Sequence, residues 1–129
     1  MTRWYLDSSA ALKLVIEEAE SAALAAAIET ERPVLLGCWL LETEMRRIAA
    51  RQPVLTQEAV SGVLDGINLL AMPSSLFREA SYLPGTSLRS LDALHLAAAV
   101  STDVDHLVTY DLRMAESARD LGLSVLAPT

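Results

Sequence analysis

The chain has 129 residues, 52% of them hydrophobic and 5% aromatic, so it can bury a core of mainly aliphatic side chains. Its formal net charge of −7 argues against a nucleic-acid partner, because domains that bind phosphate usually have more basic than acidic residues. No apolar run approaches the length of a membrane span, and the single cysteine, Cys38, excludes an internal disulfide. We therefore expect one domain over residues 1–129, without a signal peptide, in the cytoplasm.

The first predicted element is a strand over Arg3–Asp7, whose bulky residues end abruptly in an acid. Ser8 or Ser9 is expected to cap a helix that runs to about Glu18. The other expected elements are helices over 20–30, 38–51, 74–82, 91–100 and 111–121, a helix capped by Thr56, and strands over 34–37, 67–72, 106–110 and 123–126.

Strands and helices alternate along the whole chain, without repeats or linkers. Short apolar runs such as Val34–Gly37 are typical of buried parallel strands. The pattern predicts an α/β fold, a three-layer α/β/α sandwich with a parallel sheet of about five strands.

Three aspartates are predicted to meet at one edge of this sheet. Asp7 and Asp111 each follow a predicted strand, and parallel strands share the edge at which their carboxyl ends lie. Asp92 lies in the first turn of a helix for which Ser90 is the expected cap. We interpret Asp7 as the anchor of an acidic, metal-binding site.

Glu44 is the fourth candidate, because it lies on an apolar helix face. Leu41 is three residues before it and Ile48 is four residues after it. Glu42, by contrast, is expected to pair with Arg46 on the solvated side. A glutamate on a buried face needs a partner, and a metal ion is one that satisfies it.

Clustered carboxylates repel one another unless a cation lies between them. Mg²⁺ and Mn²⁺ prefer oxygen ligands, and such ions activate water for attack on a phosphodiester. If four of the 17 acids bind cations, 13 remain against ten basic residues, which weakens the objection from net charge without removing it.

Each acid also has a structural alternative. Asp7 and Asp92 can simply favour the N-termini of their helices, and Asp111 can be an ordinary N-cap. Glu44 can form an ion pair with Arg47 three residues later. The joint pattern of the four acids therefore carries more weight than any one of them.

Four further residues are candidates for supporting the acids. Ser8 and Thr109 adjoin proposed ligands and can orient them. His95, three residues after Asp92, is either a packed helix histidine or a contact to the substrate or to metal-bound water. Arg89 can position phosphates, be solvated, or hold acidic groups of a partner, as can Arg46, Arg47 and Arg113. Cys38 and the two tryptophans are most simply core residues.

The motifs around these residues resemble those of the PIN-domain ribonucleases, and among them the VapC-type toxins. The matching segments are Tyr5-Leu6-Asp7-Ser8-Ser9-Ala10, Glu44-Met45-Arg46-Arg47, Leu88 to Ala97, and Thr109-Tyr110-Asp111 with the helix after it. The resemblance implies an RNA endonuclease in which Asp7, Glu44, Asp92 and Asp111 bind Mg²⁺ or Mn²⁺. It also implies a homodimer and a cognate VapB-type antitoxin that covers the active site.

Two other functions were weighed. A haloacid-dehalogenase-like phosphatase would also place a nucleophilic aspartate, here Asp7, after the first strand, but it needs an acid where this chain has Ser9. A PIN-like interaction module without activity would be expected to lack one of the four acids, and this chain has all of them.

Overall fold

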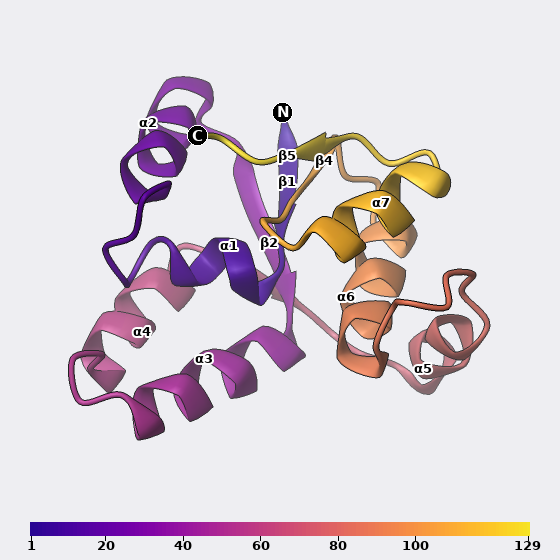
Figure 1. The fold of residues 1–129 in the computed structure, drawn as a ribbon, viewed down its shortest axis with the longest axis horizontal. Coiled ribbons are helices and arrows are strands. Elements are labelled where there is room, and N and C mark those ends of the chain that lie inside the picture. The colour runs from indigo at the N-terminus through magenta and orange to yellow at the C-terminus, as the bar shows by residue number, and fades with distance from the viewer.

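In the computed structural model, which describes residues 1–129, five parallel strands form one sheet in the order β3-β2-β1-β4-β5 (Figure 1). The strands are β1 (Arg3–Leu6), β2 (Val34–Cys38), β3 (Asn68–Leu70), β4 (His106–Val108) and β5 (Val125–Leu126). The helices are α1 (Ser8–Leu12), α2 (Ser21–Glu31), α3 (Trp39–Arg51), α4 (Gln57–Leu64), α5 (Ser74–Ser81), α6 (Ser90–Ser101) and α7 (Leu112–Asp120).

The helices cover the two faces of the sheet as two layers, α1 to α4 on one face and α5 to α7 on the other (Figure 1). Successive residues of a strand point to opposite faces, and β1 follows this rule. Trp4 and Leu6 pack against the first layer, and Tyr5 packs against the second. All three are buried because β1 is the central strand. The predicted three-layer α/β/α sandwich with five parallel strands is confirmed.

The order of the strands reverses beside β1. The chain first moves outward from β1 to β2 and β3, and then returns through α5 and α6 to place β4 on the other side of β1. In open α/β sheets a crevice forms at the carboxyl edge where the order reverses, and ligands bind there. The residues that follow β1 and β4, Asp7 and Thr109–Asp111, lie at this point.

The first helix differs from its prediction. It is capped by Asp7 and not by a serine, and it ends at Leu12 and not near Glu18. Beyond it the backbone N–H groups of Leu14 and Val15 donate to carbonyls three residues back, as in a tight 3₁₀-like turn. The apolar residues of this stretch still pack on the core, so the pattern predicted burial correctly but not the backbone.

Other boundaries also changed at the carboxyl edge. Ser90 is the first residue of α6, and Arg89, at the N-cap position, makes no capping bond through its side chain, so the predicted serine cap is wrong. The strand predicted to reach Tyr110 ends at Val108, because the N–H of Tyr110 donates to the hydroxyl of Ser9. The last strand is shortened to two residues. None of the helices is long and apolar enough to span a membrane.

Replacing two glycines by alanine should change the free energy of unfolding in opposite directions. Gly122, just after α7, has a φ of +84°, which disfavours a side chain, so Gly122→Ala should lower the free energy of unfolding by about 1 kcal/mol. Gly62 lies inside α4, where an added Cβ meets nothing within 4 Å, so Gly62→Ala should raise it by about 0.5–1 kcal/mol. Urea denaturation measures both, and changes of the same sign would contradict the argument.

Candidate active site

The four predicted acids lie near one another at the carboxyl edge. Burial raises the pKa of Asp92, and the nearby charges of Asp111 and Asp7 raise it further, whereas His95 lowers it and Glu44 makes a smaller contribution that raises it. Four acids from α3, α6 and the ends of β1 and β4 therefore lie close enough together to repel one another.

Asp7 is the most buried of the acids, with an exposed fraction of 4%. Its Oδ1 accepts hydrogen bonds from the Ser9 hydroxyl at 2.6 Å and from the backbone N–H of Ala10 at 3.1 Å. Its Oδ2 accepts one from the hydroxyl of Thr109, which follows β4. Burial raises the pKa of Asp7, and these three donors partly offset that increase because they favour the ionised form.

Glu44 is held by His95, which reaches it from α6. The His95 Nε2 lies 2.6 Å from the Glu44 Oε1, and His95 is 1% exposed. The other carboxylate oxygen, Oε2, is 3.5 Å from the hydroxyl of Ser8. The alternative ion pair between Glu44 and Arg47 is wrong, because the carboxylate turns toward α6.

The far side of the His95 ring contacts the sheet. Its Nδ1 is 2.8 Å from the Tyr5 hydroxyl and 3.7 Å from the Sγ of Cys38. Burial acts to lower the pKa of His95, but the contacts with Cys38 and Glu44 outweigh burial and raise it to about 10. The imidazole is therefore protonated at neutral pH and carries a positive charge beside Glu44.

The structure thus places His95 as a packed histidine that also orients a candidate acid. Sequence reasoning noted that His95 shares a helix face with Asp92, but it did not find the Tyr5 and Cys38 contacts. The pairing of β1 with β2 sets Tyr5 beside Leu36, two residues before Cys38, and a single sequence does not reveal this pairing.

Asp92 and Asp111 keep carboxylate oxygens without protein partners. Asp111 does cap α7, as its alternative proposed, but only its Oδ1 accepts the N–H groups of Arg113 and Met114. Its second oxygen makes no hydrogen bond, so the cap does not exclude a ligand role. The carboxylate of Asp92 accepts no hydrogen bond from the protein, and its oxygens remain open to solvent near the charges of other acids.

A divalent cation fits this set of donors. No three acid, histidine or cysteine side chains are grouped closely enough to enclose an ion directly. Mg²⁺, however, retains several waters and is commonly bound through one or two carboxylates. The repulsion around Asp92 and its unpaired oxygens are what such a cation would relieve. The donors are oxygens, which suit Mg²⁺ or Mn²⁺.

Two predictions about neighbouring residues had different outcomes. Glu42 and Arg46 do form the expected ion pair, at 3.8 Å. Trp4 lies in the core as expected, but Trp39, the first residue of α3, is 52% exposed, so its assignment to the core is wrong. Arg89 and Arg113 are exposed beside the acids and form no ion pair.

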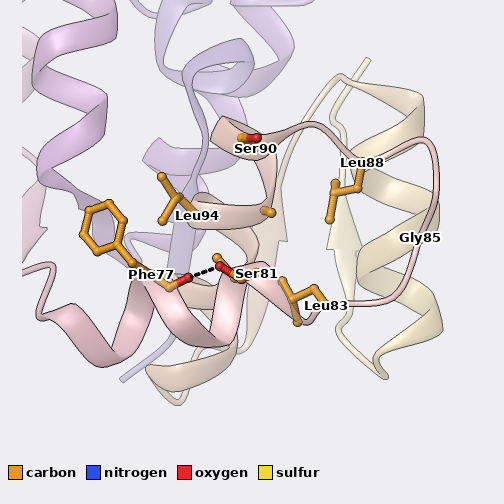
Figure 2. Close-up of a pocket in the computed structure, with 9 residues that line it drawn as sticks. Phe77, Ser81, Leu83, Gly85, Leu88, Ser90 and Leu94 are labelled. Carbon is orange, nitrogen blue, oxygen red and sulfur yellow. Dashed lines mark hydrogen bonds between the residues drawn. The ribbon is translucent and has the colours of Figure 1, made fainter.

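A separate groove of about 330 Å³ lies between α5 and α6 (Figure 2). Phe77 and Leu94 lie at one end of it, and Leu83, Gly85 and Leu88 form the opposite wall (Figure 2). No acid lines this groove, so it is distinct from the cluster of carboxylates, although Ser90 brings it close to the start of α6.

Comparison with known proteins agrees with this fold. The PIN domain family matches residues 4–120. Ribonuclease VapC46 of Mycobacterium tuberculosis is 36% identical over 131 residues, which cover 100% of both chains. Ribonuclease VapC47 of the same species is 33% identical, and the matched region covers 96% of each of the two chains. The chain belongs to the PIN-domain family, and within it to the VapC ribonucleases.

Among solved structures, VapC20 of Mycobacterium tuberculosis, a toxin described as cleaving the sarcin–ricin loop, has the same fold. Its TM-score is 0.71 at 14% identity, with 88% of this chain and 94% of that chain covered. The resemblance drawn from the motifs is therefore confirmed. Family membership removes the phosphatase alternative, and the position where that enzyme needs an acid carries the Ser9 hydroxyl, which donates to Asp7.

His95→Ala should lower the free energy of unfolding by about 2–4 kcal/mol, because it opens a cavity and leaves Glu44 and the Tyr5 hydroxyl without a partner. Tyr5→Phe, which removes one hydroxyl and keeps the ring, should cost only about 1 kcal/mol. Thermal and urea unfolding measure both. Equal losses would show that the Glu44 contact contributes nothing.

Proposed function

We propose that this VapC ribonuclease is a metal-dependent endoribonuclease that uses Asp7, Glu44, Asp92 and Asp111 to bind Mg²⁺ or Mn²⁺. The observation that carries the proposal is the carboxylate of Asp92, which accepts no hydrogen bond from the protein and lies near the charges of the other three proposed ligands. A protein has little structural reason to retain such repulsion, and a bound cation would convert it into attraction.

The cations, when bound, supply charge for the phosphodiester oxygens and activate water for its hydrolysis. The residues of the chain hold the ligands in place. Ser9 and Thr109 fix both oxygens of Asp7, and His95 fixes one oxygen of Glu44. Such outer contacts set the orientation of ligating carboxylates. Asp92 and Asp111 keep free oxygens for the ions.

We further propose that the protein is the toxin of a toxin–antitoxin pair, that it inhibits growth by cleaving cellular RNA in the cytoplasm, and that it forms a homodimer. A VapB-type antitoxin would then cover the acids. Membership of the VapC ribonucleases supports this role, and the whole length of the chain matches those relatives. The exposed side chains of Phe77 in α5 and of Tyr82 at its end are compatible with a protein partner.

Asp7→Asn and Asp92→Asn should each reduce RNA cleavage by at least about 100-fold, because each removes a negative charge from the cation site. The assay is cleavage of total RNA by purified, antitoxin-free protein. Asp120→Asn, an exposed acid at the other end of α7, is the matched control and should cleave as the wild type does. Undiminished cleavage by Asp7→Asn would sink the mechanism.

Removal of metal should abolish cleavage, and added Mg²⁺ or Mn²⁺ should restore it. Isothermal titration calorimetry should detect metal binding by the wild type and a weakening of about 10-fold or more in Asp92→Asn. This measurement does not depend on activity. A chain that binds no metal would instead be the inactive interaction module.

A further inference from the structure

The placement of the basic residues answers the objection raised by the net charge of −7. Lys13, Arg32 and Arg46 form ion pairs with nearby glutamates, and Arg3 donates to a backbone carbonyl. The side chains of the other arginines make neither a hydrogen bond nor an ion pair, and these are Arg47, Arg51, Arg78, Arg89, Arg113 and Arg119. Arg47, Arg89 and Arg113 in that group lie within three residues of a proposed metal ligand.

Two of these arginines share a helix face with a proposed metal ligand. Arg47 and Arg51 follow Glu44 in α3 at three and seven residues, which places all three within an arc of about 60°. Along the axis they lie about 4.5 and 10.5 Å beyond Glu44. Both arginines are exposed. The basic stripe, defined as Arg47 and Arg51, therefore leads outward from the acids along one side of α3.

Arg51 lies in the last turn of α3, where its charge suits the helix dipole, but neither arginine of the stripe forms an ion pair or a side-chain hydrogen bond within the protein. The carboxylate nearest to Arg47 in sequence on this face is Glu44, and it is turned to His95. Two like charges four residues apart disfavour a helix unless something binds them. Arg46, one residue away, is different, because its guanidinium contacts Glu42, Gln57 and Ser61 and so ties α3 to α4.

We propose that Arg47 and Arg51 bind backbone phosphates of single-stranded RNA on one side of the cleavage position. The inference rests on the proposed function, which requires a phosphodiester to lie at the acids. The nucleotides on one side of that phosphodiester would then lie along α3, which leads away from the acids. Guanidinium groups bind phosphate through paired N–H donors, and they offset the repulsion between an acidic protein and a polyanion.

The test is the salt dependence of RNA binding. Fluorescence anisotropy of a labelled single-stranded RNA is followed across a series of KCl concentrations, with Asp92→Asn as the background in every protein so that the RNA stays intact. Each phosphate contact contributes about 0.7 to the slope of log Kobs against log [salt] for a single strand. Arg47→Ala combined with Arg51→Ala should therefore reduce the slope by about 1.4. Arg47→Lys with Arg51→Lys should retain most of it, because lysine also binds phosphate as a point charge.

Two matched controls separate a local contact from a general loss of charge. Arg119→Ala removes an unpaired arginine at the far end of α7, and Arg46→Ala removes a paired arginine from α3 itself. Both should leave the slope within about 0.3 of the background value, less than half of one phosphate contact. The proposal is overturned if the double variant keeps the full slope, as it would if the stripe bound an acidic protein segment, or if Arg119→Ala lowers the slope equally.

Cleavage of the same RNA by the chain without the Asp92 substitution, in Mg²⁺, is measured in parallel. If the RNA is cleaved but the double variant keeps the full slope, the RNA-binding role of the basic stripe is wrong and the proposed nuclease activity stands. If the slope depends on the two arginines but no preparation cleaves the RNA, the proposed nuclease activity is wrong and the RNA-binding role of the basic stripe stands.

Discussion

The buried carboxylate of Asp7 is the constraint on which the site depends. A carboxylate that is 4% exposed is costly unless donors surround it, and here the donors come from two places in the chain. Ser9 and the N–H of Ala10 are local, whereas Thr109 is 102 residues away and adjacent only because β4 lies beside β1. The reversal of strand order, which places β4 beside β1, therefore also supplies one of the donors that make this buried acid tolerable.

Glu44 is positioned in a different way. Its helix belongs to one layer and His95 to the other, so their hydrogen bond joins the two helix layers beyond the end of the sheet. The His95 ring is fixed in turn by Tyr5 of β1 and Cys38 of β2. One acid is thus held by neutral hydroxyls and another by a cationic ring, while Asp92 and Asp111 keep free oxygens. These two kinds of support suit an acidic site whose negative charge would be balanced by a bound cation.

The net charge of a chain says little about its partners until the charges are placed. The paired cations Lys13, Arg32 and Arg46 are neutralised within the fold, whereas Arg47 and Arg51 are exposed and unpaired on the face of α3 that carries Glu44. An acidic protein can therefore present positive charge where a phosphodiester would lie. The electrostatic field at the site depends on this local arrangement of charges more than on the net charge of the chain.

Much of the fold was readable from the sequence, because the strand–helix alternation, the acids after the strands and the end of the last helix near Leu121 all follow from neighbouring residues. Ser8 and Thr109 were predicted to orient acids, and each lies within hydrogen-bond distance of one. Which acid Thr109 and His95 contact was not readable, since it depends on which strands and helices become neighbours. For the same reason the end of α1 and the exposure of Trp39 were mispredicted. The sequence determined which residues carry charge and where elements begin, and only tertiary packing decided which charges meet and which remain free.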